Sequence, residues 1–217
     1  MQPEPASSSL VARPTEPHRA AEPAPLFPAF LRLAGRKVVL VGGGTVAASK
    51  YAGLVAAGAQ VTVVAPHIGP SLRTGGTTCI ERAFEPEDLE GAWYVVAAAP
   101  APVNRQVLAA AEARHLFVNA VDDPEAATAF APAVIRRGAA TVAVSTGGAS
   151  PALAGLLREA LEAILPADVA RWTELGRTAR QTWKADGIPL AARRPLLLEA
   201  LNRLYAEGNP AAKGQPR

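Results

Sequence analysis

The sequence contains very little cysteine and no long apolar run, and each shortage excludes a class of protein. Cys79 is the single cysteine in 217 residues, so neither an internal disulfide nor a cysteine cluster for metal can form. No apolar stretch approaches the ~18 residues of a membrane span. The start of the chain has neither a secretory apolar core nor a twin-arginine pair. We therefore expect a cytoplasmic protein without a membrane partner, in which Cys79 is a small buried hydrophobe.

Charge of either sign is also spread thinly, which bears on the kind of partner. Hydrophobic residues make up 49% of the chain and charged residues 19%, as in globular proteins. The formal net charge is +3, but the chain has no dense lysine–arginine run and no basic stretch interleaved with aromatics. We therefore expect no nucleic-acid partner. The mild positive charge suits an acidic small molecule.

What the chain does contain is a regular alternation of short apolar runs with helical patterns. Strands that alternate with helices predict an α/β fold, here a Rossmann-like parallel sheet covered on both faces. The predicted strands cover residues 37–41, 60–65, 78–84, 92–99 and 116–121, and the predicted helices between them cover 45–57 and 103–114.

After residue 122 the pattern changes to a short β segment and then to helices. Apolar runs at 130–136 and 140–145 flank a glycine turn and predict a hairpin. Ser150 and Pro151 suit the N-cap and first position of a helix. Two further helices are predicted over 167–185 and 190–206. The first of the three carries an amphipathic stripe formed by Leu153, Leu156, Leu157, Ala160, Leu161 and Ile164.

A glycine loop joins the first predicted strand to the first predicted helix. Gly42, Gly44 and Ala47 match the G-x-G-x-x-G/A pattern of dinucleotide-binding folds. The first glycine permits a tight turn, the second lets the backbone approach a pyrophosphate, and the alanine lets the helix pack close to the sheet. The free N–H groups of the helix N-terminus attract negative charge. The order of strand, loop and helix predicts a dinucleotide site rather than a structural turn.

The second predicted strand lacks the acidic residue that usually holds the adenosine ribose. Its end, V-V-A-P-H at residues 63–67, supplies no carboxylate, and no clear arginine for a 2′-phosphate is present. NAD is therefore favoured, with NADP left open. His67 is expected to be an exposed loop residue, and contact with the ribose is the alternative.

Two further features could act on a substrate. Asp122 ends the fifth strand, at the edge of the sheet where open α/β folds bind ligands, so it could accept a proton as hydride leaves a substrate. Asp123 is the alternative base, and capping of the next turn is the structural alternative. The small loop at residues 145–150 enters a helix and is a possible anion site, although a simple cap by Ser150 is compatible with its sequence.

These motifs resemble those of the precorrin-2 dehydrogenase/sirohydrochlorin ferrochelatase family, which includes the N-terminal domain of siroheme synthases. The similarity runs from about Leu26 to Tyr205. It is carried by V-G-G-G-T-V-A (41–47) with Lys50, T-V-V-A-P (62–66), Asn104, V-N-A-V-D (118–122), V-A-V-S-T-G-G-A-S-P (142–151) and L-L-R-E (156–159).

The resemblance implies an NAD-dependent oxidoreductase that converts precorrin-2, a tetrapyrrole with many carboxylates, to sirohydrochlorin. Some such proteins also insert ferrous iron, as a co-substrate held by the tetrapyrrole nitrogens, and they form homodimers. Asp122 matches the family's catalytic aspartate. The expected cofactor-binding residues are Gly42, Gly43, Gly44, Thr45, Val46, Ala65, Pro66 and Asn104. The expected substrate-binding residues are Asn119, Ser145, Thr146, Gly147, Gly148 and Ser150, and no metal-binding residue is expected.

Other enzyme classes lack the residues that they need in this sequence. No Tyr-x-x-x-Lys pair, nucleophile elbow or H-E-x-x-H helix is present, so other dehydrogenase and hydrolase chemistries are not expected. The alternative function is a non-catalytic NAD-sensing module, favoured by the apolar A-A-P-A-P at residues 98–102.

The chain is predicted to have five parts. They are a disordered extension (1–25), an NAD-binding Rossmann-like domain (26–128), a β segment for dimerisation (129–150), a helical domain (151–208) and a flexible tail (209–217).

Overall fold

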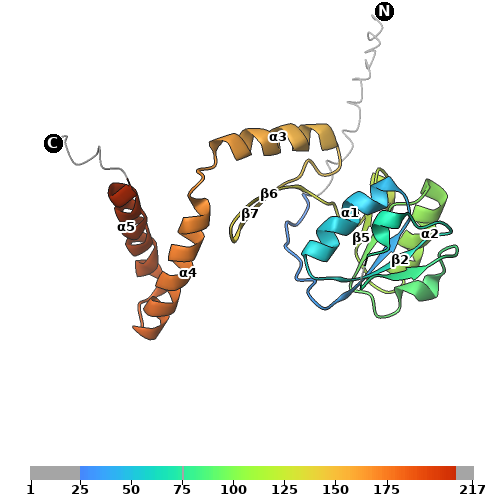
Figure 1. The fold of residues 1–217 in the computed structure, drawn as a ribbon, viewed down its shortest axis with the longest axis horizontal. Helices are drawn as coiled ribbons and strands as arrows, with labels where there is room; N and C mark the ends of the chain where they lie inside the picture. The colour runs from blue at the N-terminus through green and yellow to red at the C-terminus, as the bar shows by residue number, and fades with distance from the viewer. Residues whose placement is uncertain (1–24, 75, 209–217) are drawn as a thin grey trace, which may run out of the picture. The chain divides into compact units, whose positions relative to one another are not determined.

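The computed structural model describes residues 25–74 and 76–208 (Figure 1). The chain divides into two units between Phe30 and Leu31. Residues 25–30 contain no helix or strand, so the fold described below belongs to the second unit. The predicted extension, apart from Pro25, and the predicted tail lie outside the described residues.

Five parallel strands form one sheet, which confirms the predicted α/β class. Their order across the sheet is β3-β2-β1-β4-β5. The strands are β1 (Lys37–Val41), β2 (Gln60–Val64), β3 (Thr78–Ile80), β4 (Tyr94–Ala97) and β5 (Val118–Ala120). The predicted strand at 78–84 is too long. The chain turns after Ile80, where the Arg82 N–H donates back to the Ile80 carbonyl at 3.2 Å.

Two helices cover the two faces of this sheet. Helix α1 (Thr45–Ala56) packs on the face reached by Val38 and Leu40, whereas α2 (Ala101–Glu112) packs on the face reached by Val39 and Val41. Alternate residues of β1 thus enter different cores, and all four are buried, because the strand lies between two neighbours and two helices. The 3₁₀ helices η1 (Pro70–Leu72), η2 (Pro86–Leu89) and η3 (Pro124–Ala126) complete the connections.

The strand order creates a switch point beside β1. From β1 the chain moves outward through β2 to β3, and then crosses back to β4 on the other side of β1. The loops that leave β1 and β4 therefore diverge at the carboxyl edge of the sheet. In open α/β sheets this is where ligands bind.

The second half of the chain forms a hairpin and three helices, as predicted. The hairpin pairs β6 (Ala133–Arg137) with β7 (Ala140–Val144) in antiparallel register. Helix α3 (Pro151–Ile164) contacts both strands, and α4 (Val169–Ala185) contacts β7 and α5 (Leu190–Gly208). None of the described helices has both the length and the apolar composition of a membrane-spanning segment.

The apolar stripe of α3 is largely uncovered. Among the described residues of this helix only Ala154 is buried. Leu156 is 64% exposed and Ile164 is 75% exposed, and Leu153 and Leu157 are also exposed. A large apolar surface that stays in contact with water is unfavourable and often marks an interaction site.

A buried carboxylate holds Arg82 and Glu85 at η2, and the backbone of the same turn is bonded to the lysine that starts β1. The Asp88 side chain accepts hydrogen bonds from Arg82 Nη1 and Nη2 at 2.9 and 2.7 Å, and from the Glu85 N–H at 2.9 Å. Lys37 Nζ donates to the Asp88 and Glu90 carbonyls at 2.9 and 2.7 Å. Burial raises the pKa of Asp88, but the hydrogen bonds from Arg82 and Glu85 and the nearby positive charges outweigh it. The net pKa of Asp88 therefore lies below its usual value.

We expect Asp88→Asn to lower the free energy of unfolding at neutral pH by about 1–3 kcal/mol, because an amide pairs less well with Arg82. The folded-state pKa of Asp88 is depressed, so its contribution is present above the unfolded-state pKa and is lost as pH falls through the folded one. Urea denaturation at pH values from 7 down to 3 should show the difference in free energy of unfolding between wild type and variant becoming smaller.

The exposed pair of Glu174 and Arg177 provides the control, since exposed ion pairs contribute little. Glu174→Gln should leave the denaturation curve nearly unchanged. A gap between wild type and Asp88→Asn that stayed constant with pH would contradict the role given to the Asp88 charge.

Candidate functional site

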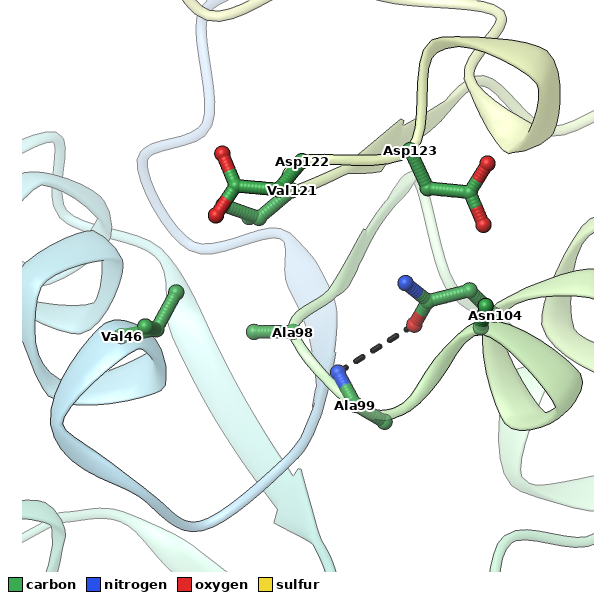
Figure 2. Close-up of a pocket in the computed structure, with 8 residues that line it drawn as sticks. Val46, Ala98, Ala99, Asn104, Val121, Asp122 and Asp123 are labelled. Carbon is green, nitrogen blue, oxygen red and sulfur yellow. Dashed lines mark hydrogen bonds between the residues drawn. The ribbon is translucent and has the colours of Figure 1, made fainter.

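A cavity of about 240 Å³ opens at the switch point (Figure 2). The first turn of α1, the loop that follows β4, the start of α2 and the segment after β5 contribute to its wall. The lining residues are Val46, Ala98, Ala99, Ala101, Asn104, Val121, Asp122 and Asp123. Three of the predicted site residues, Val46, Asn104 and Asp122, therefore meet at one cavity.

The first two glycines of the loop after β1 are required by the neighbouring backbone. A Cβ on Gly42, whose φ is +130°, would lie 2.3 Å from the Ala98 carbonyl oxygen. A Cβ on Gly43 would lie 1.8 Å from the His67 carbonyl oxygen. The Gly69 N–H also donates to the Gly43 carbonyl at 3.0 Å. The glycine loop is therefore clamped between the chain after β2 and the chain after β4.

The third glycine faces open space and begins α1. No atom lies within 4 Å of a Cβ placed on Gly44, which is the N-cap of the helix. No side chain caps this end, and the first turn contains no acidic residue. The N–H groups of Thr45 and Val46 belong to the turn whose donors have no partner within the helix. This open, electropositive turn fits the pyrophosphate of a dinucleotide.

The end of β2 supplies no charged group, as predicted. Ala65 is buried, and Pro66 and His67 are exposed. Sequence reasoning missed a carboxylate one strand further along the same edge. Glu81, directly after β3, pairs with Arg73, whose Nε donates to the Ile68 carbonyl at 3.2 Å. Because the predicted strand ran on to residue 84, Glu81 stood inside it, and its position at a strand end became visible only in the structure.

Asn104 is held in a fixed orientation on the cavity wall. It lies in the first turn of α2 and is 1% exposed. Its Oδ1 accepts a hydrogen bond from the Ala99 N–H at 3.2 Å (Figure 2). This bond ties the helix to the loop after β4, and it leaves Nδ2 as the donor on the cavity side.

The two aspartates after β5 point in different directions. Asp122 has a left-handed backbone, with φ of +58°, and an exposed side chain. Asp is one of the few residues that adopts this conformation readily. In Figure 2 the Asp122 carboxylate extends toward the side of Val46, and that of Asp123 extends toward the side of Asn104.

Asp123 does not play the capping role that its position suggests. It is the N-cap of η3, but its side chain makes no cap hydrogen bond. Its Oδ2 is buried and has no hydrogen-bond partner among the described residues. A buried acceptor without a donor costs about 1–3 kcal/mol, so this oxygen is a candidate for pairing with a ligand.

None of the residues predicted to bind substrate lines this cavity. Asn119 is buried in β5, and its Nδ2 donates to the Ala129 carbonyl at 3.1 Å, which gives its amide a structural partner. Substrate binding by Asn119 stays a prediction.

The loop at residues 145–150 is closed by its own hydroxyl groups. Ser145 Oγ accepts from the Gly147 N–H at 3.1 Å, and Ser150 Oγ accepts from the Leu153 N–H at 3.3 Å. Thr146 Oγ1 donates to the Ser150 carbonyl at 2.9 Å. Gly147 and Gly148 both have positive φ, and Gly148 packs against the Phe130 ring. The loop is a preformed turn into α3, separate from the cavity. Among the described residues, no three His, Cys, Asp or Glu side chains gather as metal ligands.

Two known families match successive parts of the chain, up to residue 164. Residues 29–133 match a family described as "Putative NAD(P)-binding". Residues 137–164 match a family described as "Sirohaem biosynthesis protein central". The first match contains the sheet and the cavity, and the second contains the turn of the hairpin, β7, the loop at 145–150 and α3.

Similar full-length proteins are siroheme synthases. Siroheme synthase 3 of Aeromonas hydrophila subsp. hydrophila is 38% identical over 199 residues, covering 87% of this chain and 42% of that protein. Siroheme synthase of Chromobacterium violaceum is 42% identical over 173 residues, covering 77% of this chain and 37% of that protein. The chain thus spans about two fifths of the length of these relatives.

A solved structure is similar over most of both chains. The protein described as "SirC, precorrin-2 dehydrogenase" aligns with a TM-score of 0.65 and 27% sequence identity. The alignment covers 80% of this chain and 88% of that one. The similarity therefore includes the parallel sheet and extends well into the second half of the fold.

We expect Gly43→Ala and Gly53→Ala to have opposite effects on stability. The new methyl at position 43 meets the His67 carbonyl, so the variant should lose about 1–3 kcal/mol. At position 53, inside α1, nothing lies within 4 Å, so alanine should add about 0.5–1 kcal/mol. Urea denaturation measures both changes. Equal effects at the two positions would contradict the close packing around Gly43.

Proposed function

Because this chain belongs to the precorrin-2 dehydrogenase/sirohydrochlorin ferrochelatase family, we propose that it oxidises precorrin-2 to sirohydrochlorin with NAD. The observation that carries the proposal is the cavity at the switch point, with an open helix N-terminus on one side and the Asp122 carboxylate on the other. A cytoplasmic location stays a prediction.

The residues around the cavity fit a dinucleotide that lies across the carboxyl edge of the sheet. The N–H groups at Gly44, Thr45 and Val46 would hold the pyrophosphate. Ala65 and Pro66 would border the adenosine half, and Asn104 the nicotinamide half. When bound, NAD supplies the acceptor for the hydride that leaves the substrate.

Asp122 is the proposed base of the reaction. Oxidation removes a hydride and a proton from the tetrapyrrole, and the proton needs an acceptor beside the nicotinamide half of the site. The Asp122 carboxylate is exposed, lines the cavity and has no ion-pair partner among the described residues. It can therefore take up a proton and release it to water.

We also propose that the protein works as a homodimer. The exposed stripe on α3 adjoins the loop at residues 145–150, which does not line the cavity of its own chain. A partner subunit that covers the stripe would remove apolar surface from water. The loop, with Ser145, Thr146, Gly147, Gly148 and Ser150, would then be placed to bind carboxylates of a substrate shared between subunits.

Insertion of ferrous iron into sirohydrochlorin is proposed as a second activity of the same site. Here iron is a substrate, and the tetrapyrrole nitrogens hold it, so the protein needs to supply only a base for the pyrrole protons. The exposed Asp122 carboxylate suits that role. An anaerobic assay with ferrous iron and sirohydrochlorin, against a control without protein, tests the proposal by the change in absorbance.

We expect Asp122→Asn to reduce turnover of precorrin-2 by about 10²-fold or more, because the amide cannot accept the proton. The affinity for NAD should stay within about twofold, since the pyrophosphate contacts lie elsewhere. Anaerobic formation of NADH and of sirohydrochlorin measures the first quantity, and calorimetric titration measures the second. Undiminished turnover would remove Asp122 from the reaction. A wild-type chain that bound NAD without turnover would favour the NAD-sensing module instead.

We expect Leu156→Asp on α3 to convert a dimer to a monomer, since the new charge would be buried at the interface. Sedimentation velocity over a dilution series measures the mass. Val55→Asp is the matched control, because Val55 is a similarly exposed apolar residue on α1. A wild-type chain that sedimented as a monomer, or equal dissociation by both variants, would exclude this interface.

A further inference from the structure

The cavity wall near α2 presents a hydrogen-bond donor whose orientation is fixed. Asn104 is 1% exposed, and its Oδ1 is engaged by the Ala99 N–H at 3.2 Å. Nδ2 has no hydrogen-bond acceptor among the described residues and is the polar group that Asn104 offers to the cavity. Figure 2 shows it on the side that faces the segment after β5.

The same wall carries an acceptor that lacks a donor. Asp123 lines the cavity, and its Oδ2 is buried with no hydrogen-bond partner among the described residues. The carboxylate extends to the side of Asn104, away from the side to which Asp122 extends (Figure 2). Because the terminal torsion of aspartate is broad, the carboxylate can reorient to meet a ligand in the cavity that Asp123 lines.

A donor and an acceptor on one wall are the complement of a primary carboxamide, which presents a carbonyl oxygen and an NH₂ group side by side. We propose that Asn104 and Asp123 together bind the carboxamide of the nicotinamide ring, with Asn104 Nδ2 donating to its oxygen and Asp123 accepting from its nitrogen. This inference rests on the proposed function in one respect, because it takes NAD to be the dinucleotide that binds.

This pairing assigns different tasks to the two adjacent aspartates. Asp122, whose side chain is exposed, exchanges a proton with the substrate, whereas Asp123 positions the ring. A carboxamide held at both of its polar groups cannot flip, so one face of the ring is presented toward the substrate. Asp123 is therefore a cofactor-positioning residue that determines which pyridine dinucleotides bind.

The test compares NAD with 3-acetylpyridine adenine dinucleotide, in which a methyl group replaces the carboxamide NH₂. Binding of each is measured by calorimetric titration without tetrapyrrole, so the readout does not depend on turnover. We expect the wild-type chain to bind NAD about tenfold more tightly than the analogue. Asp123→Ala should bring the ratio of the two affinities close to one. The change should come mainly from weaker NAD binding, because the analogue has no N–H that could donate to Asp123.

Two further variants keep the test independent of folding. Asp123→Asn retains an acceptor oxygen and should preserve a large part of the ratio. Glu125→Ala removes a nearby exposed carboxylate and should leave the ratio at its wild-type value. Thermal unfolding without ligand distinguishes a cofactor-positioning role of Asp123 from a structural role. Asp123→Ala should keep or raise the melting temperature, because it removes a buried acceptor that has no donor.

The outcomes are distinct. If the affinity for NAD relative to the analogue were the same in wild type and Asp123→Ala, the assignment would be overturned and the proposed function would stay intact. That result would indicate that Asp123 binds only water. A lowered melting temperature together with an unchanged ratio would make Asp123 a structural residue. A wild-type chain that bound neither dinucleotide would overturn the proposed function itself.

Discussion

The structure depends on the close contact of three backbone segments at the carboxyl end of β1. Gly42 lies against the Ala98 carbonyl and Gly43 against the His67 carbonyl, with no room for a Cβ at either position. This contact holds the loops after β2 and β4 against the glycine loop. Helix α1 therefore starts at a fixed place, with an uncapped first turn, and the cavity opens between this turn and the end of β5.

Most of the fold could be predicted from the sequence, because its signals are local. The apolar run at Lys37–Val41, the glycine turn after it and the helical spacing that follows specify one βαβ unit without tertiary information. Errors occur where tertiary contacts decide. Strand β3 ends at Ile80 rather than at residue 84, because the chain turns there and the Arg82 N–H bonds back to the Ile80 carbonyl. The stripe on α3 was recognisable, but its exposure depends on what the rest of the chain leaves uncovered.

The candidate site could be predicted only in part. Val46 and Asp122 were recognisable because residues at strand ends and helix starts converge at one edge of a parallel sheet, whereas Asn104 was expected only from the family resemblance. Asn119 stands in a strand, and sequence could not indicate that its amide would pair with the Ala129 carbonyl. The pair of Arg73 with Glu81 joins residues across a loop. Such partners depend on three-dimensional geometry that residue spacing does not encode.

The left-handed backbone at Asp122 explains how two adjacent carboxylates can serve one cavity. Two carboxylates that faced the same space would repel each other, and each would disfavour the charge of its neighbour. With φ at +58°, the Asp122 side chain turns toward the side of Val46, and that of Asp123 turns toward the side of Asn104. One carboxylate stays in contact with water, where a proton can be released, and the other is sheltered, where a hydrogen bond is strongest. In the proposed reaction, the left-handed backbone at Asp122 would therefore keep acid–base chemistry and cofactor binding on different sides of the cavity.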